Sequence, residues 1–251
     1  MKRKICIALA VLFAAVFVFS AVNLCLTVAE YQQAENLYND VQKQYVGPAV
    51  TVPSPPEQPD VPKEELIAVD FEGLLSANSD VVGWLYVPDT EINYPVVQAE
   101  DNQTYLHKGL NGKYLRSGTI FADYRNGLPM QDRNYIIYGH SMKNGSMFGM
   151  LLHYKKQAYY DKHPVWYYLT PEQNYRVELF AGRVVKTNHI IYQVNADDNE
   201  FSEYLQKSIE ESTFQSDVKV TDSDAIITLS TCSYEFDQAR YVVLGKLVPI
   251  E

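Results

Sequence analysis

The chain has 251 residues and a formal charge of −10, from 21 Lys and Arg against 31 Asp and Glu. Hydrophobic residues make up 47% and charged residues 21%, a composition typical of a globular protein and not of a disordered chain. The acidic balance argues against nucleic-acid binding, which needs a basic footprint. Three cysteines are too few for a disulfide-dense scaffold.

The N-terminus carries an uncharged run over residues 5–29, directly after Lys2, Arg3 and Lys4. About 20 apolar residues suffice to span a membrane, so the run predicts a transmembrane anchor. A cleaved signal peptide is the alternative, but its apolar region is usually about 7–15 residues long. The positive-inside rule leaves residues 1–4 in the cytoplasm and places the chain from about residue 30 outside the cell.

This placement separates the three cysteines. Cys6 and Cys25 fall inside the predicted anchor, and Cys232 lies in the exported part. An exported cysteine with no intramolecular disulfide partner is either an inert buried thiol or a reactive one.

Residues 30–62 predict a stalk and a proline-rich linker. A short helical stripe of apolar residues continues from the anchor, and we interpret it as a helix without a partner. The stripe consists of Tyr31, Ala34, Tyr38, Val41 and Tyr45. Six of the 12 prolines then fall between residues 48 and 62, which predicts an extended, semi-rigid spacer.

The part from residue 63 to residue 251 is expected to form the folded domain. Apolar spacing predicts a helix over residues 63–77. Strand signals then dominate, at 83–87, 92–97, 118–122, 134–138, 165–169, 175–186, 225–231 and 241–248. Helical stretches are expected within 147–162 and at 199–212. This order predicts a mainly β fold, a barrel or a sandwich with helical insertions.

Three polar side chains stand at strand ends, where a rigid element can hold them beside a cleft. Cys232 ends the apolar strand that begins at Ile226, and His140 follows the strand 134–138 after a glycine. A thiol with an ordinary pKa of about 8.5 is mostly protonated at neutral pH, and an imidazole can activate it. Arg240 opens the last strand, where a guanidinium could stabilise an oxyanion. Alone, each could also be a packing or surface residue.

Together these segments resemble the sortases, membrane-anchored cysteine transpeptidases of Gram-positive bacteria. The resemblance rests on Thr228-Leu229-Ser230-Thr231-Cys232, on Arg240 and on Tyr138-Gly139-His140. Further segments resemble class B members: Val82-Gly83-Trp84-Leu85, Ile92-Asn93-Tyr94-Pro95-Val96-Val97-Gln98, Gly118-Thr119-Ile120-Phe121-Ala122-Asp123-Tyr124-Arg125-Asn126 and Met147-Phe148. The resemblance covers about residues 64–251.

The resemblance implies an eight-stranded sortase β-barrel, with N-terminal helices that would match residues 63–77 and a helix between strands six and seven. It implies that Cys232 attacks the threonine carbonyl of a C-terminal sorting motif and forms a thioacyl-enzyme. His140 would be the general acid and then the general base, and Arg240 would hold the oxyanion or the substrate backbone. Class B motifs often begin Asn-Pro and end Thr-Asn or Thr-Gly.

The resemblance also implies a set of substrate-binding positions. They are Asn102, Leu106, Tyr138, Ser230, Thr187, Ile191 and Tyr192. Thr187, Ile191 and Tyr192 lie in the loop 187–192, whose sequence diverges from the family. Ordinary loop packing is the alternative interpretation for these three residues. No cofactor and no metal site are expected.

The expected partners are surface proteins that bear a sorting signal, and an amine of peptidoglycan or of its lipid-linked precursor. The N-terminal helix would contact the membrane, and no nucleic acid is expected. Three alternatives remain open: a pilin polymerase that uses a pilin lysine, a peptidase that releases its substrate to water, and a non-catalytic anchored adaptor.

Overall fold

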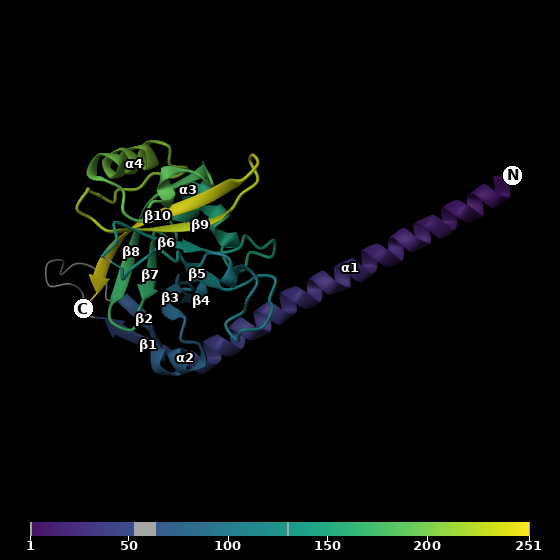
Figure 1. Cartoon of the computed structure of the whole chain (residues 1–251), viewed down its shortest axis with the longest axis horizontal. Helices are drawn as coiled ribbons and strands as arrows, with labels where there is room; N and C mark the ends of the chain where they lie inside the picture. The colour runs from purple at the N-terminus through teal and green to yellow at the C-terminus, as the bar shows by residue number, and fades with distance from the viewer. Residues whose placement is uncertain (1, 53–63, 130, 251) are drawn as a thin grey trace. The chain divides into compact units, whose positions relative to one another are not determined.

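The computed structural model describes residues 2–52, 64–129 and 131–250 of the chain (Figure 1). The chain divides into two compact units, Met1–Asp40 and Val41–Glu251. Residues 2–40 of the first unit belong to one helix, α1 (Lys2–Tyr45), whose final turn falls in the second unit.

Helix α1 is long and apolar enough to cross a membrane. Its large apolar side chains, such as Phe13, Phe17 and Phe19, are exposed in the isolated chain. Two polar side chains in this stretch bond to the helix itself: Asn23 donates to the Phe19 carbonyl and Thr27 to the Asn23 carbonyl, each at 2.9 Å. Such internal bonding is what a helix in lipid requires, because the bilayer core offers polar groups no water.

The second unit is built on a closed eight-stranded barrel, in the order β10-β8-β7-β3-β4-β5-β6-β9. The strands are β3 (Val81–Tyr86), β4 (Asn93–Val97), β5 (Ile120–Ala122), β6 (Asn134–Tyr138), β7 (Val165–Leu169), β8 (Asn174–Lys186), β9 (Ile226–Cys232) and β10 (Ala239–Ile250). All eight predicted strands are present, with ends shifted by at most two residues. Closure removes the exposed sheet edges that a sandwich would leave.

Two strand pairs of the barrel are parallel, β4 with β5 and β6 with β9, and the others are antiparallel. The β6–β9 pair brings together segments far apart in the sequence. All the residues of β9 before Cys232 are buried, as expected for a near-continuous apolar strand with both faces covered. This pair positions the site described below.

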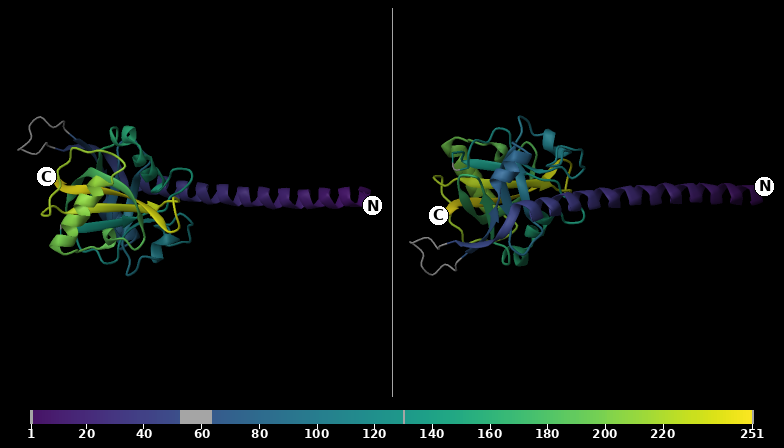
Figure 2. Two further views of the ribbon diagram at one scale, coloured as in Figure 1. Left: turned by 90° about the horizontal axis from the view of Figure 1, so that it is seen from above. Right: turned by 90° about the horizontal axis from the view of Figure 1, so that it is seen from below.

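Short helices lie in the connections between the barrel strands: η1 (Thr104–Leu106), η2 (Gly149–Lys155), α3 (Gln157–Tyr160) and η3 (Ile190–Tyr192). The longer α4 (Asp198–Glu210) lies between the sixth and seventh barrel strands, as expected. Asp197 caps it by accepting a 2.9 Å bond from the Glu200 amide, and Phe201 and Leu205 are buried. It packs on the outside of the barrel against β8 (Figure 2).

The predicted helix over 63–77 is wrong in its first half. Residues 64–69 form β2 (Glu64–Val69), which pairs antiparallel with β1 (Val46–Val52). Helix α2 (Phe71–Ala77) begins only after Asp70, whose carboxylate accepts a 2.9 Å bond from the Gly73 amide. The strand-forming residues 46–52 supply a pairing partner that helical periodicity does not reveal.

The predicted stalk and linker also change. Residues 46–52 form a strand and not a free spacer, whereas residues 53–62 of the predicted linker lie outside the described residues. The folded unit begins at Val41, not at residue 63. Gln42 donates to the Asn93 carbonyl at 2.7 Å, and the Tyr45 carbonyl accepts from Asp70 at 2.8 Å. Val41 is buried, so the end of the helical stripe does have packing partners.

Candidate active site

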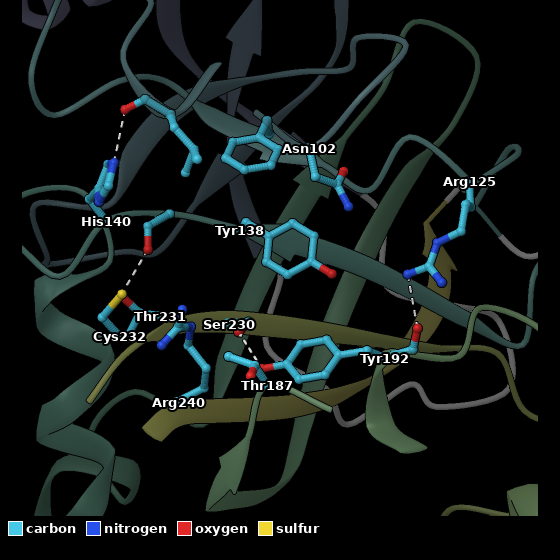
Figure 3. A pocket seen from close by; sticks show the side chains of 13 residues that line it. Asn102, Arg125, Tyr138, His140, Thr187, Tyr192, Ser230, Thr231, Cys232 and Arg240 are labelled. Atoms are coloured by element: carbon cyan, nitrogen blue, oxygen red, sulfur yellow. Dashed lines mark hydrogen bonds between the residues drawn. The ribbon is translucent and has the colours of Figure 1, made fainter. Parts of the chain in front are cut away.

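A pocket of about 460 Å³ opens where β6 and β9 end and β10 begins (Figure 3). It takes in all three side chains selected from the sequence as catalytic, and six of the seven selected as substrate-binding. Its lining residues are Asn102, Leu106, Phe121, Arg125, Tyr138, Gly139, His140, Thr187, Tyr192, Ser230, Thr231, Cys232 and Arg240.

Strand register explains why Cys232, His140 and Arg240 meet. Cys232 and Arg240 are direct partners across the antiparallel β9–β10 pair, and such partners have Cα atoms about 4.5–5.5 Å apart. In the parallel β6–β9 pair, Tyr138 is the partner of Ser230. Alternate residues share a face of a strand. The residues two positions further on, His140 and Cys232, therefore reach the same end of the pocket (Figure 3).

The imidazole of His140 is held by a main-chain group. Its Nε2 lies 2.8 Å from the carbonyl oxygen of Leu106. A carbonyl only accepts, so Nε2 carries the hydrogen and Nδ1 is left to exchange a proton. Burial lowers the pKa of His140; the Leu106 carbonyl opposes this effect, and His107 and Arg240 add to it. His140 stacks on His107 with ring centroids 5.6 Å apart. These surroundings favour the neutral imidazole at pH 7.

Cys232 and Arg240 are both partly exposed to the pocket, and Cys232 is a free thiol. One guanidinium nitrogen of Arg240, Nη1, donates to the Ala239 carbonyl at 2.9 Å, which fixes the side chain near its own backbone. A thiol, an imidazole and a fixed cation in one pocket provide a nucleophile, a proton shuttle and an electrostatic stabiliser, which is what acyl transfer needs.

Other lining residues form the walls of the pocket. The hydroxyl of Tyr192 lies 2.9 Å from the Ser230 Oγ, and its ring stacks on that of Tyr138 at 6.1 Å. Burial raises the pKa of Tyr192 to about 12, so it stays a neutral phenol. Thr187 donates to the Gln238 Oε1 at 3.0 Å, which links the loop 187–192 to the turn before β10.

Ile191 does not line the pocket. Its side chain is fully buried, at 0% exposure, in an apolar cluster with Phe201 and Tyr204 of α4. Ile191 therefore packs η3 against α4 and does not have the predicted place in the pocket wall. The alternative of ordinary loop packing, which the sequence left open, describes Ile191.

Sequence reasoning assigned no role to several residues at the pocket. Phe121, Arg125, Gly139 and Thr231 line it, and the fully buried carboxylate of Asp123 lies beneath Arg125, Tyr138 and Asn102. Most of these residues fell within segments that resembled class B sortases. The one local signal for Asp123 is a carboxylate directly after an apolar strand, because a buried acid needs partners.

In the part of the chain that the structure describes, His, Cys, Asp and Glu form no group of three that could hold a metal ion.

Comparison with known proteins agrees with this geometry. The profile of the sortase domain matches residues 85–248. Sortase B of Listeria monocytogenes is 38% identical over 238 residues, which cover 93% of this chain and 92% of that protein. A structure of Bacillus anthracis sortase B in complex with AAEK1 has a TM-score of 0.74 and 34% identity, over 88% of this chain and 99% of that one. A Staphylococcus aureus sortase B–substrate complex has a TM-score of 0.68 and 33% identity, over 72% and 85% of the two chains.

The match to the sortase domain covers more than half of the chain, and the similarity to sortase B extends over nearly its full length. This chain therefore belongs to the sortase family of cysteine transpeptidases, and within it to class B.

Proposed function

We propose that this class B sortase cleaves a C-terminal sorting motif after threonine, through a thioacyl intermediate on Cys232, and transfers the protein to an amine. The observation that carries the proposal is the meeting of Cys232, His140 and Arg240 at one end of a single pocket. Cys6 and Cys25 both lie in the apolar part of α1, which leaves Cys232 as the nucleophile.

The first half-reaction forms the thioester. As the Cys232 sulfur attacks the carbonyl carbon of the threonine, its thiol proton passes to Nδ1 of the neutral His140. Arg240 stabilises the charge that develops on the carbonyl oxygen. The C–N bond then breaks as His140 gives a proton to the leaving amine. Because Nε2 is held by the Leu106 carbonyl, this proton passes through Nδ1.

The second half-reaction releases the product. An incoming amine attacks the thioester carbon and His140 removes its extra proton. The C–S bond then breaks, and the Cys232 sulfur takes this proton back to restore the thiol and the neutral imidazole. The new amide joins the threonine carbonyl to the acceptor. The walls of the pocket beyond the catalytic end would hold the motif residues that precede the threonine. The S. aureus sortase B solved as a substrate complex supports a substrate site in this chain.

The cellular setting is part of the proposal. Helix α1 would anchor the protein, with Lys2, Arg3 and Lys4 on the cytoplasmic side and the catalytic unit outside the cell. The partners would be surface proteins with a sorting signal, and an amine of peptidoglycan or of its lipid-linked precursor. This placement brings substrate, acceptor and enzyme to the outer face of one membrane.

Partitioning of the acyl group tests this function. The full chain in detergent is incubated with Asn-Pro-X-Thr-Asn and Asn-Pro-X-Thr-Gly peptides and with either a glycine peptide or a lysine amide. Transfer to the glycine amine is expected, and preferred transfer to the lysine side chain would indicate a pilin polymerase instead. Release to water alone, with both amines present, would contradict transpeptidation and support a peptidase.

A Cys232→Ala variant is expected to lose both cleavage and transfer, while His140→Ala and Arg240→Ala lose most of the turnover and remain folded. Turnover retained in Cys232→Ala would remove Cys232 as the nucleophile. Rates near wild type in the other two variants would contradict the roles given to His140 and Arg240. An inert Cys232 in a folded protein would favour the adaptor.

A further inference from the structure

Asp123, just after β5, is a buried carboxylate. Its partners Asn102, Tyr138 and Arg125 line the part of the pocket away from Cys232 (Figure 3). The carboxylate is fully buried and accepts five hydrogen bonds. Three come from Arg125: the main-chain N to Oδ1 at 3.0 Å, Nε to Oδ1 at 2.8 Å and Nη2 to Oδ2 at 2.7 Å. The other two reach Oδ2, from Tyr138 at 2.8 Å and from Asn102 at 3.0 Å. Charge-assisted bonds of this kind are stronger than neutral ones.

The charge of Asp123 is stable despite its burial. Burial opposes ionisation, but the hydrogen bonds from Arg125, Tyr138 and Asn102 outweigh it and hold the pKa of Asp123 below its ordinary value. The carboxylate thus remains an acceptor throughout the neutral range. Its two-point pairing with Arg125 fixes the guanidinium plane, because carboxylate and guanidinium match as planar groups.

The bonds join separate parts of the wall. Asn102 comes from the loop before η1, Tyr138 from the end of β6 and Arg125 from the segment after β5. Arg125 also donates from Nη2 to the Tyr192 carbonyl at 2.9 Å, which ties down η3. Asn102 is fixed at both ends of its amide, since its Oδ1 accepts from the Tyr124 amide at 3.0 Å. Three further lining residues, Asn102, Tyr138 and Tyr192, are therefore held by one ion pair (Figure 3).

We propose that Asp123 and Arg125 are positioning residues that shape the part of the pocket that receives the motif residues preceding the threonine. The inference rests on the proposed function, because that function places the threonine at Cys232 and the preceding residues along the rest of the pocket. Arg125, 42% exposed, forms part of the wall, and Asp123, 0% exposed, acts through its neighbours.

This arrangement separates binding from chemistry. Neither residue has a hydrogen bond to Cys232, His140 or Arg240 among the contacts of the described residues. Loss of the ion pair should loosen Asn102, Tyr138 and Tyr192 and leave the catalytic end intact. The effect should therefore appear in KM and not in kcat.

The test uses the full chain in detergent and the Asn-Pro-X-Thr peptide that the wild type cleaves best. Asp123→Asn keeps the shape of the side chain and removes its charge, and Arg125→Gln removes the charge from a partly exposed position. Each is expected to raise KM about tenfold or more, as the loss of charge-assisted bonds predicts. The kcat value and the rate at which iodoacetamide alkylates Cys232 should stay close to wild type.

A second peptide, with Ala-Ala in place of Asn-Pro, identifies the residues on which the pair acts. With this peptide the variants and the wild type should have similar kcat/KM. Lys246→Gln is the matched control, because Lys246 pairs with Asp224 at 2.9 Å and lies on β10 at the end opposite Arg240. It should leave KM unchanged.

Unchanged KM in Arg125→Gln would overturn the inference, and this variant keeps the test valid if Asp123→Asn fails to fold. A fall in kcat with slower alkylation of Cys232 would also overturn it. So would an equal fall in kcat/KM with the Ala-Ala peptide. Failure of the wild type to form any acyl-enzyme is a different outcome, because it contradicts the proposed function itself.

Discussion

Gly139 lies between Tyr138 and His140 at a place where a methyl group has no room. A Cβ built there meets Cγ, Cδ2 and Cβ of Phe148 at 2.7, 2.8 and 3.2 Å, whereas carbon atoms normally approach to about 3.5–4.0 Å. Phe148 is fully buried, with its ring edge against Trp166. The Gly139 backbone is also held. Its amide donates to the Ser230 carbonyl at 3.2 Å, and its carbonyl accepts from the Thr231 hydroxyl at 2.8 Å.

Gly139→Ala must therefore displace a buried ring or the end of β6. Overpacking of this kind costs about 1–3 kcal/mol. For a domain of this size, at about 2–4 °C per kcal/mol, Tm should fall by about 2–12 °C. His140 is the next residue, and a shift of about 1 Å in a catalytic group can reduce the rate about a hundredfold. We expect kcat/KM to fall by more than the loss of folded protein explains.

Thermal melting and peptide cleavage measure both effects. Gly47→Ala is the control, because its Cβ would meet only Ala68 atoms at 3.6 and 3.7 Å, an ordinary contact. Adding Phe148→Leu to Gly139→Ala should recover part of the lost stability, which a double-mutant cycle detects. A Gly139→Ala protein with unchanged Tm and unchanged kcat/KM would refute the reasoning.

Three further predictions concern other groups. Asn134 is buried, and its Nδ2 donates to the carbonyls of Ile191 and Gln193 at 2.8 and 3.1 Å. Asn134→Ala should therefore lower the free energy of unfolding by about 2 kcal/mol or more. An unchanged midpoint of urea unfolding would contradict this. Burial opposes ionisation of Glu235, but bonds from Lys155 and Ser233 lower its pKa to about 2. Because the pKa is lower in the folded than in the unfolded state, ionised Glu235 stabilises the fold above pH 4.5, and this stabilisation is lost as pH falls toward 2. The Tm advantage of wild type over Glu235→Gln should therefore vanish between pH 4.5 and 2. A constant difference in Tm would argue against the ion pair. Nuclear magnetic resonance should give His140 a titration midpoint below its ordinary value of 6.5, whereas a midpoint at or above 6.5 would contradict the effect of its burial.

Periodicity in the sequence predicts the barrel well because its strands carry their own signals. Each has β-branched and aromatic residues bounded by turn residues. The first half of the helix predicted at 63–77 was wrong because the competing interaction is long-range: residues 64–69 pair with residues 46–52. Local apolar spacing does not register a pairing partner.

The site divides in the same way. Cys232, His140 and Arg240 are found from strand ends and from family resemblance, and strand register then explains how they meet. Ile191 was misplaced because adjacent residues of a short 3₁₀ turn point to different sides, and sequence does not say which side faces α4. Asp123 was missed because its role depends on three partners from separate segments.

The most direct test of the central claim is the intact mass of the protein after incubation with the motif peptides. The full chain is incubated with Asn-Pro-X-Thr-Asn and Asn-Pro-X-Thr-Gly peptides, without acceptor and then with a glycine peptide. We expect the mass of the peptide acyl group to be added at Cys232, to disappear when the amine is added, and to be absent in Cys232→Ala. An adduct that persists in Cys232→Ala, or its absence from a wild-type protein that cleaves the peptide, would contradict the thioacyl mechanism.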